Sequence, residues 1–173
     1  MSFHSVRVPS QYAAAVERAG TALAARFARH VPGVRDGWLV LPHSGRPVAV
    51  WDLKEKRGAD TPEQEARRIE LARTLAAAGL AVTVPSWAFM VFFAELPADR
   101  TGPRYTVVHD DSSLGALFGE AHLVMDAWTN IHVATARLPG EADRRCAGFN
   151  RVQEAQVASG SPVGSHVSPG TTV

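Results

Sequence analysis

The stretch "DGWLVLPHSGRPVAVWDLK", residues 36–54, decides the expected fold. Two apolar runs flank a Pro-His-Ser-Gly segment, a pattern typical of a β-hairpin. With a three-residue loop at 43–45, Asp36 lies opposite Asp52. Directly opposed residues of a hairpin are about 5 Å apart and point to the same face of the sheet. We therefore expect two carboxylates to converge at one end of this hairpin.

A lysine accompanies the two carboxylates. Side chains alternate along a strand, so Lys54 shares a face with Asp52. Lys54 and Lys56 are the only lysines among 18 basic residues; the others are arginines. Carboxylate oxygens are the ligands that Mg²⁺ prefers, and an ammonium can position an attacking water or stabilise phosphate charge. The pattern predicts an Mg²⁺ (or Mn²⁺) site with Asp36 and Asp52 as ligands and Lys54 as the water-positioning group.

The flanking segments predict an α/β protein with a mixed central sheet flanked by helices, in the order α-β-β-α-β-β-β-α. The second expected helix has an N-cap at Thr61, an N1 proline at Pro62 and a capping-box partner at Gln64. Gly79 is a typical C-terminal stop for this helix. Ser10 can cap the first helix. The expected helices are 11–30, 62–79, 112–128 and 141–158, and the expected strands outside the hairpin are 80–87, 88–96, 104–110 and 131–138.

These elements make up one domain, residues 1–158, and leave a tail, 159–173, that is rich in glycine, serine and proline and is expected to be disordered. The domain divides into a core of about residues 10–110 and a C-terminal extension, 111–158, which matches no motif.

At this point the residues resemble a family. The aspartate that opens the first hairpin strand and the acidic-X-Lys triplet that closes the second, Asp52-Leu53-Lys54, resemble the signature of the PD-(D/E)XK, or restriction-endonuclease-like, nucleases. The following segment, "TPEQEARRIELARTLAAAGLAVTV", is similar in layout to the Holliday-junction resolvase and virus-type replication-repair branches. The resemblance covers the chain to about residue 84.

The resemblance implies metal-dependent hydrolysis of DNA phosphodiesters, on a restriction-endonuclease-like fold. It adds Gln64, at the start of the second helix, and Glu17, on the first helix, as supporting catalytic residues. The Leu53 carbonyl is a third candidate metal ligand. DNA is the implied partner, and cleavage of both strands would need a homodimer. Such scaffolds also serve as inactive binding modules, so the alternative is a non-catalytic interaction or accessory protein with a protein partner at the C-terminal region.

Whole-chain properties limit the function classes. The formal net charge of +1 gives no strong global attraction to nucleic acid or membrane. The single cysteine, Cys146, excludes an internal disulfide and fits a reducing compartment. The first ten residues lack the apolar core of a signal peptide, and the most apolar window contains a proline and ends at Glu95. We expect a cytoplasmic protein that does not enter the membrane.

Two further patterns compete with the Lys54 site. His122 and Asp126 would lie on one face of the expected helix 112–128, and with His109 they offer ligands for a transition metal such as zinc. The arginines of the second helix could form a rim that binds phosphates, although pairing with neighbouring glutamates explains them better. These arginines and glutamates are Arg67, Arg68, Arg73, Glu63, Glu65 and Glu70.

Overall fold

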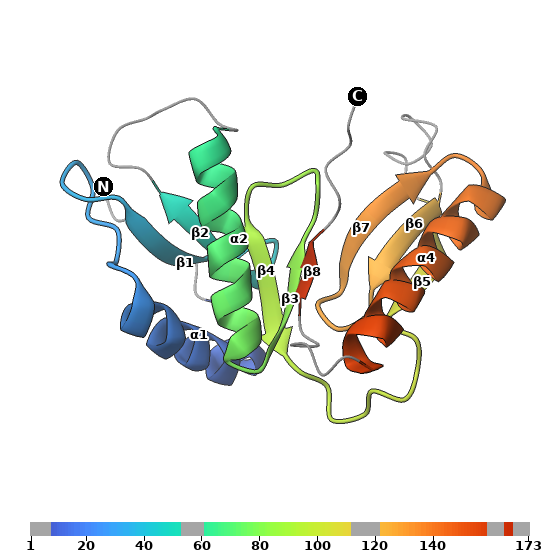
Figure 1. Ribbon diagram of the computed structural model, residues 1–173, viewed down its shortest axis with the longest axis horizontal. Helices are drawn as coiled ribbons and strands as arrows, with labels where there is room; N and C mark the ends of the chain where they lie inside the picture. The colour runs from blue at the N-terminus through green and yellow to red at the C-terminus, as the bar shows by residue number, and fades with distance from the viewer. Residues whose placement is uncertain (1–7, 53–60, 112–121, 159–164, 168–173) are drawn as a thin grey trace.

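A computed structural model of the protein describes residues 8–52, 61–111, 122–158 and 165–167 (Figure 1). The described strands form two sheets, one of five strands and one of three. In chain order the elements are η1 (Ser10–Tyr12), α1 (Ala13–Arg26), β1 (Gly37–His43), β2 (Arg46–Asp52), α2 (Pro62–Ala77), β3 (Leu80–Val84), β4 (Val91–Glu95), β5 (Tyr105–His109), β6 (His122–Asp126), β7 (Ile131–Ala136), α4 (Pro139–Ala158) and β8 (Ser165–Val167).

The five-stranded sheet has the order β1-β2-β4-β3-β8 and carries α1 and α2 on one face (Figure 1). All its strand pairs are antiparallel except β3 with β8. Small residues on one side of α1, Ala15 and Ala19, let that helix approach the core closely. The main core lies between the helices and the sheet and includes Leu23, Trp38, Leu71, Leu75, Leu80, Val82, Val91 and Phe93.

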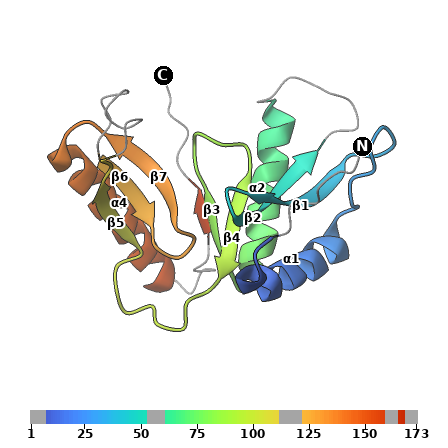
Figure 2. The same cartoon turned by 180° about the vertical axis from the view of Figure 1, so that it is seen from behind.

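The three-stranded sheet has the order β5-β6-β7, is antiparallel throughout, and packs against α4. Figure 2 shows this unit beside the five-stranded sheet from the opposite side. Ile131, the first residue of β7, packs against Val48 and Phe92 of the five-stranded sheet. Apolar contacts therefore join the two sheets.

The coarse prediction of an α/β protein with helices beside a mixed sheet is confirmed. The order of elements agrees with the prediction as far as β5. The second helix begins after its Thr61 cap, and Gly79 follows its end with a φ of +79°, as expected for a C-terminal stop. The capping role predicted for Ser10 is wrong, because Ser10 opens a 3₁₀ turn and makes no side-chain cap bond.

The helix predicted over 112–128 is wrong for its described part. Residues 122–126 form β6, which pairs with strands on both sides, and residues 112–121 lie outside the described residues. Val124 and Asp126 are both fully buried, two residues apart, which is the period of a strand. Asn130, with a φ of +56°, completes the turn into β7. An alternation of buried and less buried residues over only five positions is too short to distinguish a strand from a helix in the sequence.

The disorder predicted for 159–173 is wrong for residues 165–167. They form β8, which pairs in parallel with β3, with Thr83 opposite His166. These three residues pair with the edge of β3 that β4 does not occupy. No local feature of the sequence predicts a strand at 165–167. In the described residues, no helix has the length and hydropathy that a membrane span requires.

Candidate functional site at the end of the five-stranded sheet

The hairpin register differs from the one that the sequence predicts. A two-residue turn, Ser44 and Gly45, joins β1 to β2, with φ angles of 47° and 74°. Positive φ at both turn residues is the geometry that matches the twist of a tight hairpin. With one loop residue fewer, Gly37 lies opposite Asp52. The predicted pairing of Asp36 with Asp52 is wrong, because a shift of one residue moves a side chain to the other face of the strand.

Asp52 lies beside a histidine instead. Its Oδ2 is 3.6 Å from Nε2 of His30, whose side chain is only 7% exposed. The segment around His30 pairs with the outer edge of β1. A Cβ at Gly37 would lie 2.4 Å from backbone atoms of Ala28 and His30. Because Gly37 has no side chain, the backbone of residues 28–30 can lie close against β1.

The structure does not place Glu17 beside Asp52. Glu17 is exposed on α1 next to Arg18, whose guanidinium lies 3.0 Å from the carboxylate of Glu95. Glu95 ends β4, and β4 runs antiparallel to β2, so this ion pair marks the opposite end of the sheet from Asp52. Two other predicted site residues lie outside the described part of the chain: Leu53 and Lys54.

Gln64 occupies the first turn of α2 and lines a hollow. The Oγ1 of Thr61 accepts a hydrogen bond from the Gln64 backbone N–H at 3.2 Å. The hollow has a volume of about 260 Å³. Oε1 of Gln64 and Nε of Arg68 are buried without a hydrogen-bond partner in the described residues. The residues that line the hollow are Thr61, Pro62, Gln64, Glu65, Arg68 and Phe89.

The start of α2 lies over the end of β2. The Arg67 guanidinium is 4.9 Å from the ring centroid of Trp51, the residue before Asp52. Arg67 also pairs with Glu70 at 2.8 Å, and Arg68 pairs with Glu65. The interpretation of these two helix arginines as partners of neighbouring glutamates is therefore confirmed, and their charges are largely neutralised within the helix.

The loop between β3 and β4 forms the other side of the hollow. Arg68 donates a hydrogen bond to the Ala88 carbonyl and so holds this loop against α2. Trp87 and Phe89 are 47% and 52% exposed, although the sequence analysis placed both in strands. The Trp87 ring stacks on His132, with centroids 4.5 Å apart, and its Nε1 donates to the His132 carbonyl at 3.0 Å. Phe89 therefore lines the hollow as an exposed aromatic ring, whereas Trp87 packs against Phe92 and His132.

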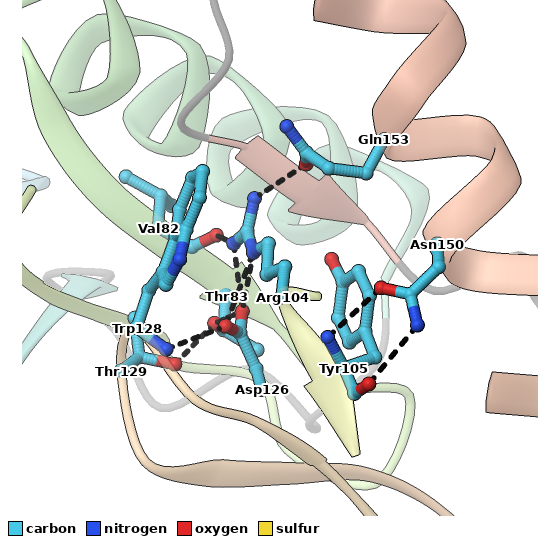
Figure 3. A network of polar contacts seen from close by, with 9 residues as sticks. All are labelled: Val82, Thr83, Arg104, Tyr105, Asp126, Trp128, Thr129, Asn150 and Gln153. Atoms are coloured by element: carbon cyan, nitrogen blue, oxygen red, sulfur yellow. Dashed lines mark hydrogen bonds and ion pairs between the residues drawn. The ribbon is translucent and has the colours of Figure 1, made fainter. Parts of the chain in front are cut away.

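A second polar cluster, absent from the sequence analysis, lies between the two sheets (Figure 3). Arg104 is 2% exposed and Asp126 is 0% exposed. The guanidinium donates to Asp126 at 2.7 to 3.1 Å, to the Val82 carbonyl at 2.9 Å and to Gln153 Oε1 at 2.9 Å. Thr83 donates to Asp126 at 2.6 Å. We call this cluster the Arg104 clasp.

The Arg104 clasp joins four parts of the chain. The clasp contains Arg104 itself, which directly precedes β5, and residues of three other elements. Val82 and Thr83 belong to β3, Asp126 to β6, and Gln153 to α4. The Trp128 ring lies 4.5 Å from the guanidinium carbon of Arg104, and Thr129 contacts Thr83. Beside the clasp, burial raises the pKa of Tyr105 well above its ordinary value, which keeps the phenol neutral.

The histidine-centred metal site predicted for His109, His122 and Asp126 is not formed as expected. Asp126 is buried in the Arg104 clasp, and β6 separates it from His122 by four residues, about 13 Å along a strand. Among residues 8–52, 61–111, 122–158 and 165–167, no three histidine, cysteine or acidic side chains are grouped to hold a metal ion.

Comparison of the chain with protein-family models, with curated proteins and with solved structures finds no match in any of the three.

Proposed function

We propose that the protein is a non-catalytic interaction module that binds an extended segment of a protein partner at the start of α2. The observation that carries the proposal is the hollow of about 260 Å³ beside Gln64, Arg68 and Phe89. Its volume is just below the range of about 300–1,000 Å³ typical of small-molecule sites. It suits one apolar side chain of a bound segment.

The polar atoms beside the hollow support binding of a peptide. A buried polar group without a hydrogen-bond partner costs about 1–3 kcal/mol, so a ligand that supplies the partner recovers this cost. The side-chain amide of Gln64 offers both an acceptor and donors, which complement a peptide N–H and C=O. Exposed Phe89, which lines the hollow, adds an aromatic side chain of the kind that is enriched at protein interfaces.

The charge pattern favours a protein partner over nucleic acid. Arg67 and Arg68 are paired with Glu70 and Glu65, so neither presents an uncompensated charge to a phosphate backbone. The formal net charge of the chain is +1. Affinity for nucleic acid comes mainly from basic groups that displace counterions from phosphates.

Selection from a library of displayed peptides tests the proposal. We expect peptides that bind the wild-type protein and lose at least tenfold in affinity with Phe89→Ser and with Gln64→Ala. Val152→Ser is the matched control, because Val152 is 59% exposed on α4, in the other unit of the protein. Peptides that bind all three variants equally would contradict the proposed site.

A second candidate is the nuclease that the resemblance implies. The observation in its favour is that α2, with Gln64 in its first turn, contacts the end of β2 that carries Asp52. The register of the β1–β2 hairpin argues against a nuclease, because Asp36 and Asp52 are not opposite each other. The two-carboxylate set for Mg²⁺ or Mn²⁺ does not fit this hairpin, and we derive no catalytic step through the metal.

Cleavage assays separate the two candidates. Plasmid, linear and branched DNA would be incubated with Mg²⁺ or Mn²⁺ and with the wild type, Lys54→Ala or Lys56→Ala. The interaction module predicts no cutting by any of the three. Metal-dependent cutting that is lost with Lys54→Ala and kept with Lys56→Ala would establish the nuclease and overturn our first proposal.

A further inference from the structure

Two histidines face each other where β5 ends and β6 begins. His109 is the last residue of β5 and His122 the first residue of β6, and the two are directly opposed in the antiparallel register. Their ring centroids are 5.0 Å apart and their planes differ by 44°. Opposed cross-strand residues project from the same face, so both imidazoles meet on one side of the sheet.

An aspartate orients one of the rings. Oδ1 of Asp111 lies 3.0 Å from Nε2 of His109. A carboxylate that accepts a hydrogen bond from one ring nitrogen fixes the tautomer and leaves the other nitrogen, Nδ1, as a lone-pair donor. The same arrangement recurs at histidine ligands of metal ions.

The site is open to solvent. The side chain of His109 is 57% exposed and that of Asp111 is 88% exposed, whereas His122 is half-buried. An ion can therefore reach the two rings without rearrangement of the core. The half-buried position of His122 restricts its rotamers, which lowers the entropy lost when it coordinates an ion.

We propose that His109 and His122 bind one transition-metal ion, with Asp111 as the group that orients His109. Neutral imidazoles suit Zn²⁺, Ni²⁺ and Cu²⁺, whereas Mg²⁺ and Ca²⁺ prefer oxygen ligands. Among the described residues no group of three histidine, cysteine or acidic side chains is arranged to hold an ion, so the proposal rests on the two imidazoles as ligands, with water able to fill open coordination positions. A site with two protein ligands and exchangeable waters binds its ion reversibly. It differs from the site expected from the sequence, since Asp126 takes no part.

Calorimetric titration of the full chain with Zn²⁺ tests this site. We expect one Zn²⁺ per chain and at least a tenfold loss of affinity with His109→Gln and with His122→Gln. The double variant should bind no more weakly than the weaker single variant, because the two rings act as a unit. His43→Gln is the control: it lies in an exposed position at the end of β1, and its ring packs only against Phe92 among the aromatic contacts described.

A second readout locates the ion independently of variant stability. Paramagnetic Ni²⁺ should broaden the amide signals of His109 and His122 at concentrations that leave that of His43 unchanged. An equal Zn²⁺ affinity in the wild type and His109→Gln would overturn the proposal, as would the absence of any binding. His109 is exposed, so its replacement leaves the fold intact and this outcome is interpretable.

Discussion

The Arg104 clasp and the start of α2 are two polar regions of one small protein, and they are built differently. In the clasp, every nitrogen of the buried Arg104 guanidinium donates to an acceptor. At the start of α2, Gln64 Oε1 and Arg68 Nε are buried with no partner in the described residues. Fully satisfied networks fix a structure, whereas unsatisfied groups in a native protein call for an explanation such as a ligand. We therefore attribute a stabilising role to the clasp, and the unpartnered atoms beside the hollow support the binding site that we propose there.

The largest expected effect is on the clasp. Asp126→Asn leaves the Arg104 charge buried without its counter-ion, which typically costs about 3–5 kcal/mol of folding free energy. Urea denaturation measures this loss. The control is Glu141→Gln, which breaks the half-exposed pair with Arg145 and should cost less than about 1 kcal/mol. Equal losses in the two variants would show that the clasp does not hold the sheets together.

The next effect concerns the glycine opposite Asp52. Gly37→Ala places a Cβ 2.4 Å from backbone atoms of Ala28 and His30, and overpacking of this kind costs about 1–3 kcal/mol. Gly20→Ala is the matched control, since a Cβ there meets nothing within 4 Å. Alanine is preferred to glycine inside a helix by roughly 1 kcal/mol, so this control should be stabilised. Thermal or urea unfolding of both variants measures the difference, and a Gly37→Ala protein as stable as the wild type would contradict the close packing of residues 28–30 against Gly37.

The third effect is a pH dependence beside the clasp. Burial raises the pKa of Tyr105, so the folded state keeps a neutral phenol while the unfolded chain ionises above about pH 10. The stabilising contribution is present below that pH and is lost as the pH rises, by up to about 1.4 kcal/mol per pH unit. Unfolding of the wild type and Tyr105→Phe between pH 9 and 11 should show a shallower loss in the variant. Parallel curves would mean that Tyr105 ionises as freely when folded.

The smallest effect is on the hairpin turn. Ser44 has a φ of +47°, and asparagine adopts this conformation more readily than serine. Ser44→Asn should therefore stabilise the protein by a few tenths of a kcal/mol, a rough figure consistent with turn preferences. A destabilised variant would indicate a loop other than the two-residue turn.

Local signals in the sequence predicted local structure. The Thr61 cap, the Gly79 stop and the apolar runs of the hairpin each act within a few residues, and each prediction agrees with the structure. The hairpin register was wrong because it depends on whether one residue, His43, belongs to the turn or to the strand. That single residue decides which side chain faces Asp52.

Long-range features could not be predicted. Arg104 and Asp126 are 22 residues apart, and nothing near either residue marks them as partners. The sequence shows Asp126 as an acidic residue directly after an apolar run. We interpreted it as a metal ligand, because we expected a helix there. The exposure of Phe89 likewise depends on the loop between β3 and β4, whose residues were predicted to belong to two adjacent strands, 80–87 and 88–96.

A titration of the ¹⁵N-labelled protein with Mn²⁺ shows whether Asp36 and Asp52 form a two-carboxylate metal site, because paramagnetic broadening reports the position of the ion. Since Gly37, and not Asp36, lies opposite Asp52, we expect no saturable broadening centred on the amides of Asp36, Gly37 and Asp52. Saturable broadening at these three amides that disappears in Asp52→Asn would contradict this expectation and restore the nuclease as the first candidate.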